Sequence, residues 1–121
     1  MADEHLSEDE ISRRLPVWCA LSDAFLDTEL DERDYRHMAE VIRAQGFTAA
    51  EAEAMFRTEV APAFAENLWS VAGQWAGWSE QTVQERVLEN RNRAFAGWTN
   101  RLMLGKFLDE EWARIAAHLT A

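Results

Sequence analysis

The chain has 121 residues, 48% of them hydrophobic, which is enough apolar material for one hydrophobic core and argues against a disordered chain. Its 22 acidic residues against 12 Lys and Arg give a net charge of −10, which disfavours direct binding to nucleic acid or to anionic membranes, because both are negatively charged. No apolar run reaches the roughly 18 residues of a membrane span, and the first residues are acidic where a signal peptide is basic, so we expect a cytoplasmic protein.

Charge is distributed unevenly along the chain. Residues 1–34 hold eleven acids against three Arg, a net charge of −8, whereas residues 86–106 hold four Arg and one Lys against one Glu, a net charge of +4. Because opposite charges attract, we expect the basic stretch to pack near the acidic first third, within the fold or across a dimer.

The first helix is predicted to begin at Ser7. Ser7 followed three residues later by Glu10 is a capping-box pattern. Apolar residues then recur at steps of three and four, as they do on one face of a helix: Ile11, Leu15, Trp18, Leu21 and Phe25. Pro16 has no N–H to donate to Ser12, so we expect the helix to kink or to restart there.

A connector over residues 26–31 leads to the second predicted helix, which Asp31 is expected to cap. The apolar stripe of this helix consists of Tyr35, Met38, Ala39 and Ile42. Gly46 supplies the left-handed residue that ends many helices, and Phe47 is then expected to fold back on Ile42.

Thr48 and Glu51 form a second capping box, which predicts the start of a third helix with the apolar residues Ala52, Met55, Phe56 and Val60. Pro62 is expected to divide this helix from a fourth segment, whose apolar residues at helical spacing are Phe64, Leu68, Val71, Ala72 and Trp75. A turn over residues 77–79 ends the fourth segment.

Ser79 is expected to cap a long helix with a break near Gly97, and its apolar residues are Val83, Val87, Ala94, Trp98 and Leu102. Gly105 is expected to end this helix. Asp109 is then expected to cap a final helix that carries Trp112, Ile115, Ala116 and Leu119.

No segment alternates apolar and polar residues in the manner of a half-buried strand, and no internal repeat is evident. The sequence therefore predicts an all-α fold. We expect residues 1–121 to form one bundle-like domain of five to seven helices, with residues 1–6 frayed.

The sequence carries no recognisable catalytic, metal-binding or cofactor-binding motif. His5, His37 and His118 lie far apart, without a second His or a Cys at the spacing of metal ligands, and there is no glycine-rich phosphate loop. Cys19 is the single cysteine, and its apolar neighbours favour a small buried side chain over a reactive thiol. We therefore expect no metal, no cofactor and no catalytic residue.

Four carboxylates crowd the end of the first helix and the connector, and we call them the acidic cluster: Asp23, Asp27, Glu29 and Asp31. Such carboxylates can bind a cation or protonate a substrate. A helical di-metal site also needs Glu-x-x-His ligands from several helices, and the sequence has none. Solvated surface with helix caps is the first interpretation of the cluster, and a partner-binding surface is the second.

Six tryptophans are present, and four of them continue apolar stripes and are expected in the core: Trp18, Trp75, Trp98 and Trp112. Trp69 and Trp78 fit those stripes less well. Each is interpreted either as packing at the edge of the core or as a partly exposed interface anchor, because Trp buries a large area at low entropic cost.

Two blocks of the chain, residues 16–30 and 59–77, follow the pattern PVWxALSDxFLDTEL … EVAPxxxxNLxxVAGxWAG. In these blocks the chain resembles an uncharacterised family of small bacterial proteins, and the resemblance implies no activity. Where the pattern of that family usually has an acid and a Phe, this chain has Gln74 and Trp78. Asp27 or Thr28 in the first block is expected to cap a helix, and Asn67 in the second block is expected to satisfy a buried carbonyl.

These features favour a non-enzymatic acidic protein that neutralises or regulates another protein, as immunity proteins and antitoxins do, because a negative field speeds association with a basic surface. The expected partner is a toxin or a nucleic-acid-binding protein, contacted through Asp23, Asp27, Glu29, Asp31, Trp69 and Trp78. Three alternatives stay open: a nucleic-acid-mimicking inhibitor, a structural or assembly module such as a homodimer, and an enzyme with an unrecognised site.

Overall fold

A computed structural model describes residues 6–26, 29–69, 76–93 and 98–120, apart from the side chains of Trp69 and of residues 98–101. These residues form helices and connecting segments without a β-strand, which confirms the predicted all-α fold. In chain order the elements are α1 (Glu8–Ser22), the 3₁₀ turn η1 (Asp23–Phe25), α2 (Glu32–Ala44), α3 (Ala49–Met55), the π-helix η2 (Phe56–Val60), α4 (Ala61–Phe64), the 3₁₀-helix η3 (Ala65–Trp69), α5 (Glu80–Asn90) and α6 (Trp98–Leu119).

Four of the predicted helix starts are confirmed by side-chain caps, at Ser7, Asp31, Thr48 and Ser79. The Asp31 carboxylate accepts from the backbone N–H of Asp34, and the Asp31 N–H donates to the Asp34 carboxylate; Thr48 and Glu51 make the same pair of bonds. At α1 the Ser7 hydroxyl accepts from the Glu10 N–H at 3.1 Å, while the Glu10 carboxylate bonds Arg14.

The predicted end of α2 at Gly46 is also confirmed. Gly46 has a φ of +79°, the left-handed conformation that glycine adopts without steric cost. Its N–H donates to the Arg43 carbonyl at 3.0 Å, and the N–H of Phe47 donates to the Ile42 carbonyl at 3.2 Å, which are the two bonds of a Schellman ending. Phe47 is buried, with the Arg13 guanidinium stacked on its ring.

The predicted restart at Pro16 and the predicted division at Pro62 do not occur. The helix α1 runs unbroken through Pro16, so the predicted restart there is wrong; the exposed position of Ser12 lets water bond the carbonyl that Pro16 leaves without a donor. Pro62 likewise lies within a continuous helical run from Ala49 to Trp69.

The chain accommodates Pro62 through the π-helix that precedes it. In a regular α-helix the carbonyl of Thr58 would accept from the N–H of residue 62, which proline lacks. That carbonyl instead accepts from the N–H of Asn92 at 2.6 Å. Asn92 has a φ of 66°, and this left-handed turn directly after α5 aims its N–H at the π-helix. The end of α5 is thereby attached to η2.

The predictions for the last third of the chain are partly wrong. The helix that starts at Ser79 ends at Asn90, and α6 then passes through Gly105 and Asp109 without the predicted stop and cap. A buried stripe continues along α6 across both positions: Leu104, Leu108, Trp112 and Ile115. Burial of this stripe outweighs the cost of about 1 kcal/mol for a glycine inside a helix. Leu102, predicted on the apolar stripe, is 56% exposed.

Some predictions concern positions outside the described residues. These are the predicted break at Gly97, the burial of the Trp98 side chain, and the apolar positions Val71, Ala72, Trp75 and Ala94. Trp18 and Trp112, by contrast, are confirmed as core residues.

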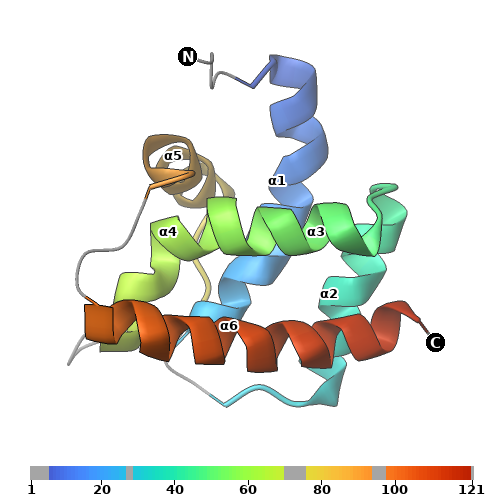
Figure 1. Ribbon diagram of the computed structural model, residues 1–121. Helices are drawn as coiled ribbons and strands as arrows, with labels where there is room; N and C mark the ends of the chain where they lie inside the picture. Colours follow the sequence, from blue (N-terminus) through green and yellow to red (C-terminus); the bar gives the residue numbers. More distant parts are fainter. Residues whose placement is uncertain (1–5, 27–28, 70–75, 94–97, 121) are drawn as a thin grey trace.

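The helices pack around one cluster of buried side chains. α6 packs against α2 and also contacts α3, while α5 packs against α1 and α4 (Figure 1). Aromatic rings join these layers, because Phe25 lies 5.6 Å from both Phe56 and Phe107, and Phe56 lies 6.1 Å from Trp112 between ring centroids. None of the described helices has the length and apolarity to cross a membrane.

Candidate functional site

A buried carboxylate joins three helical segments. Glu59 lies on the π-helix η2 and is 4% exposed. Its Oε1 accepts from the indole Nε1 of Trp18 at 2.9 Å, and its Oε2 accepts from Nη1 of Arg14 at 2.5 Å. Nη2 of Arg91, at the end of α5, lies 3.6 Å from the same Oε2. We call these four residues the Glu59 network.

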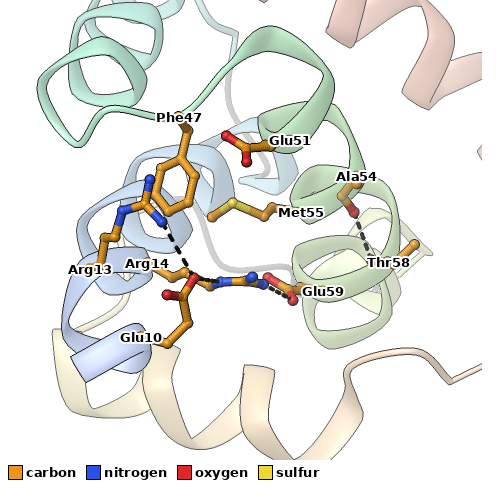
Figure 2. A pocket seen from close by; sticks show the side chains of 9 residues that line it. All are labelled: Glu10, Arg13, Arg14, Phe47, Glu51, Ala54, Met55, Thr58 and Glu59. Atoms are coloured by element: carbon orange, nitrogen blue, oxygen red, sulfur yellow. Dashed lines mark hydrogen bonds and ion pairs between the residues drawn. The ribbon is translucent and has the colours of Figure 1, made fainter. Parts of the chain in front are cut away.

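Two members of the Glu59 network, Arg14 and Glu59, line a cleft of about 190 Å³ between α1 and the α3–η2 run (Figure 2). Arg14 crosses this cleft, because its Nε donates to Glu10 at 2.6 Å while its Nη1 reaches Glu59. Arg13 lies at the rim, where it donates to the carbonyls of Gln45 and Gly46 at the end of α2. The remaining walls are formed by Phe47, Glu51, Ala54, Met55 and Thr58.

The groups in this cleft are engaged in holding helices together. The Thr58 hydroxyl donates to the carbonyl of Ala54 at 2.7 Å, so it is not bonded to a base that would activate it. Arg13 and Arg14 bond helix-end carbonyls and carboxylates. In the part of the chain that the structure describes, no three His, Cys, Asp or Glu side chains are grouped as metal ligands would be. The cleft therefore favours a structural role.

Glu59 is not among the site residues predicted from the sequence, although the sequence contains a signal for it. Glu59 follows Met55 by four residues and Phe56 by three, which places its carboxylate on the apolar face of the helix. A charged residue on such a face requires a buried partner. Trp18 and Glu59 also lie in the two separate blocks that carry the family resemblance, and the structure brings them into contact.

The acidic cluster separates into different environments. Asp31 is exposed and caps α2, and the backbone N–H of Asp34 lowers the pKa of its carboxyl. Asp23 is half-buried after α1; burial raises the pKa of its carboxyl, while nearby His37 lowers it. Glu29 is exposed, and Asp27 lies outside the described residues. The cluster therefore does not converge on one cation or substrate among its described members.

Glu29 lines a second hollow, which we call the connector groove, between the connector and α6. The groove has a volume of about 320 Å³ and is lined by Ala24, Leu26, Glu29, Leu30, Tyr35, Leu68, Phe107, Glu111 and Arg114. The Tyr35 hydroxyl donates to Oε1 of Glu111 at 2.9 Å and accepts from Nη1 of Arg114 at 3.1 Å. Burial raises the pKa of the Glu111 carboxyl, against the lowering effect of the Tyr35 hydrogen bond and of Arg114. Glu111 was not singled out from the sequence.

Of the two tryptophans interpreted as edge packing or as interface anchors, the structure describes the side chain of only Trp78. Trp78 is half-buried, with its ring centroid 4.5 Å from that of Phe64 and the Arg86 guanidinium 5.9 Å from its centroid, which is packing at the edge of the core. The side chain of Trp69 lies outside the described residues. Asn67 bonds a backbone carbonyl as expected, since its Nδ2 donates to the carbonyl of Phe25 at 2.8 Å.

The basic stretch 86–106 packs partly as expected. α5 lies against α1, in the acidic first third. The ion pairs described for this stretch, however, run from Arg91 to Glu59 and from Arg93 to Glu66, and both acids lie outside residues 1–34. These two ion pairs therefore do not neutralise any of the acidic residues in the first third of the chain.

We expect the Cys19 thiol to react slowly with alkylating agents. Burial, reinforced by the nearby carboxylates of Glu80 and Asp23, raises its pKa to about 11, so the thiolate is scarce. At about pH 8, iodoacetamide should modify the folded protein roughly a hundredfold more slowly than a free thiol. The urea-unfolded protein serves as the control and should react at the free-thiol rate; an equal rate for the folded protein would contradict the expectation.

Comparison with curated proteins and with solved structures gives no match. A family model does match: residues 12–118 fit the family described as Domain of unknown function (DUF7079). The match spans both sequence blocks as well as the Glu59 network and the residues that line the connector groove. This confirms the expectation of an uncharacterised family, and the chain belongs to the domain family of unknown function DUF7079.

Proposed function

We propose that this protein is a non-enzymatic acidic binding protein, which neutralises or regulates another protein by covering a basic surface, as immunity proteins and antitoxins do. The observation that carries the proposal is the group of exposed carboxylates at the connector and the first turn of α2: Glu29, Asp31, Glu32 and Asp34. The described basic side chains that contact them are Arg33, 3.5 Å from Asp31, and His118, 2.8 Å from Glu32.

An excess of negative charge at one end of a helix acts at a distance. Such a field attracts a basic partner before contact and raises the association rate, and salt screens the effect. The net charge of −10 adds to this local field. The cleft above the Glu59 network supports the non-enzymatic part of the proposal, because its polar groups are used in helix packing.

The test begins with an affinity pull-down from the source cells, with mass spectrometry to identify the partner. The association rate is then measured against ionic strength for a variant with the substitutions Asp23→Asn, Asp27→Asn, Glu29→Gln and Asp31→Asn. We expect association at low salt to slow by roughly tenfold, with the difference narrowing as salt is added. The fold should persist, because Asn caps a helix about as well as Asp.

A matched control removes four exposed acids elsewhere, at Glu40, Glu66, Glu85 and Glu89, each replaced by Gln. Both variants change the net charge by +4, so a local contact is distinguished from the effect of total charge. Association of the control should slow much less than that of the acidic-cluster variant. Parent-like kinetics of a folded acidic-cluster variant at low salt would remove this surface from the interface.

A further inference from the structure

We propose that the connector groove is the anchor site for the partner, and that it receives one arginine side chain together with an adjacent apolar side chain of the same partner segment. The inference rests on the proposed function and names the chemistry that the bound surface must present. The residues that support it are the carboxylates of Glu29 and Glu111 and the apolar residues that lie between these carboxylates and Met103.

The carboxylates of Glu29 and Glu111 give the connector groove its negative charge. Glu111 is half-buried, and its Oε1 is held in place by the Tyr35 hydroxyl at 2.9 Å. Glu29 lines the same groove from the connector. Among the described residues, neither carboxylate belongs to an ion pair. Arg114 acts on Glu111 electrostatically but forms no ion pair with it. A half-buried carboxylate outside an ion pair gains more from an incoming cation than a fully solvated one does, because water screens it less.

Apolar residues of the groove fit the rest of an arginine side chain. Leu26, Leu30, Leu68 and Phe107 contribute to its walls beside the ring of Tyr35. The methylene stem of arginine packs on such a surface, and its planar guanidinium stacks on aromatic faces and bonds carboxylates with two parallel N–H groups. Arg114 leaves the groove net acidic, because the two carboxylates of Glu29 and Glu111 outnumber its single guanidinium.

A further hollow lies next to the connector groove. It has a volume of about 240 Å³, is lined by Leu68, Met103, Leu104 and Phe107, and shares Leu68 and Phe107 with the connector groove. Met103 is 56% exposed, as is its neighbour Leu102. A flexible methionine on such a surface adapts to an apolar side chain of a partner. The two hollows together thus match a segment with an apolar and a basic residue side by side.

The negative charge of the groove and of the whole chain determines which class of ligand can bind there. A second copy of this chain would bring another net charge of −10 to an acidic surface, which opposes self-association. An acidic or nucleic-acid ligand is opposed for the same reason. Arginine is also one of the residues that most often anchor protein interfaces, where it enters a pocket and excludes water.

The first test uses the partner identified by the pull-down and compares two groove variants with two matched controls. Glu111→Gln and Met103→Glu change the groove, whereas Glu110→Gln and Leu88→Glu make the same chemical changes at exposed positions that line neither of the two hollows. We expect each groove variant to raise the dissociation rate by tenfold or more and each control by less than about twofold. Circular dichroism verifies that all four remain folded.

The second test needs no natural partner. The probe is a synthetic helix-forming peptide with leucine and arginine four residues apart, compared with the same peptide carrying glutamine in place of arginine. With ¹⁵N-labelled protein, the arginine peptide should shift the amide signals of Glu29, Met103 and Glu111, and the glutamine peptide should not. Glu111→Gln should abolish the difference between the two peptides.

The outcomes separate the two proposals. If the acidic-cluster variant weakens partner binding but the groove variants dissociate like the parent, the proposed function stands and the arginine anchor is wrong. Equal binding of both peptides, or signal shifts confined to another face, overturns the anchor as well. Sedimentation that shows a dimer in the parent and a monomer in Met103→Glu would assign this surface to a second copy and overturn the arginine partner.

Discussion

Replacing Glu59 with alanine is expected to lower the free energy of unfolding by about 3–5 kcal/mol, the usual loss when one member of a buried ion pair is removed. The Arg14 side chain is 24% exposed and that of Arg91 is 13% exposed, so water replaces the lost carboxylate poorly. Trp18 also loses the acceptor of its indole N–H. Three segments, α1, η2 and the end of α5, are weakened by one substitution.

Urea unfolding followed by circular dichroism measures this effect. Glu59→Gln should cost less than Glu59→Ala, because the amide oxygen still accepts from Trp18 although the charge is lost. The control is Glu53→Gln, which removes a partly exposed ion pair with Arg57 one helical turn away and is expected to cost only about 0.5 kcal/mol. Equal midpoints for Glu59→Ala and Glu53→Gln would show that the Glu59 network contributes little to stability.

Trp18→Ala is the second substitution with a large expected effect, a loss of about 3–5 kcal/mol, which is typical of truncating a large buried aromatic side chain. Trp18 has 0% exposure in the middle of the core-facing stripe of α1. The substitution leaves a cavity and also leaves Oε1 of Glu59 without its indole donor. Trp18→Phe retains most of the ring volume and isolates the loss of the hydrogen bond, expected at about 1–3 kcal/mol.

Circular dichroism is the appropriate measurement for these variants, since fluorescence would change with the removed indole itself. The pair Trp18→Phe and Glu59→Gln should be non-additive, because the two side chains share one hydrogen bond. Leu88→Ala, at a 38% exposed position on α5, provides a control for truncation of a large apolar side chain. An unchanged midpoint for Trp18→Ala would refute the placement of Trp18 in the core.

The helix starts and the end of α2 could be predicted because their causes are local. A cap at Asp31 or Thr48 depends on backbone groups within three residues, and the Schellman ending at Gly46 depends on the preceding turn and the following residue. Such bonds form from short-range geometry, so the residue pattern alone indicates them.

The wrong predictions concern helix ends, where contacts with residues distant in sequence outweigh the local signals. Gly105 and Asp109 carry the correct local signals for an end and a start, yet Leu104 and Leu108 before and between them are buried with Trp112 in the core. The area that these side chains bury depends on α2, α3 and η1 packing around α6, and no local pattern shows this. Pro62 was misread because its effect on the helix is absorbed by η2 and by Asn92.

The candidate surfaces could be predicted only in part. Glu29 was identified from its acidic neighbours, but Glu111 comes from α6, and only the fold brings it to the groove that Glu29 lines. Glu59 meets Arg14 across 45 positions and Trp18 across 41, and a single sequence shows no such pairing. The acidic cluster was defined by proximity along the chain, and its described members proved to serve a cap, a half-buried site and a groove.

The π-helix η2 has a further consequence, which concerns chain length. Before it, Ala52, Met55 and Phe56 point to the core, and after it Phe64 and Ala65 do so, although a regular helix would carry that face on to residue 63, which is only half-buried. The wider turn shifts the inward-facing register by one position. Deleting one residue from 56–60 would restore an ordinary turn and move Phe64 and Ala65 back by one position, onto the face that a regular helix turns to the core. A further inserted residue would instead rotate the downstream side chains by about 100° away from the core. We therefore expect this segment to tolerate the loss of one residue better than the gain of one.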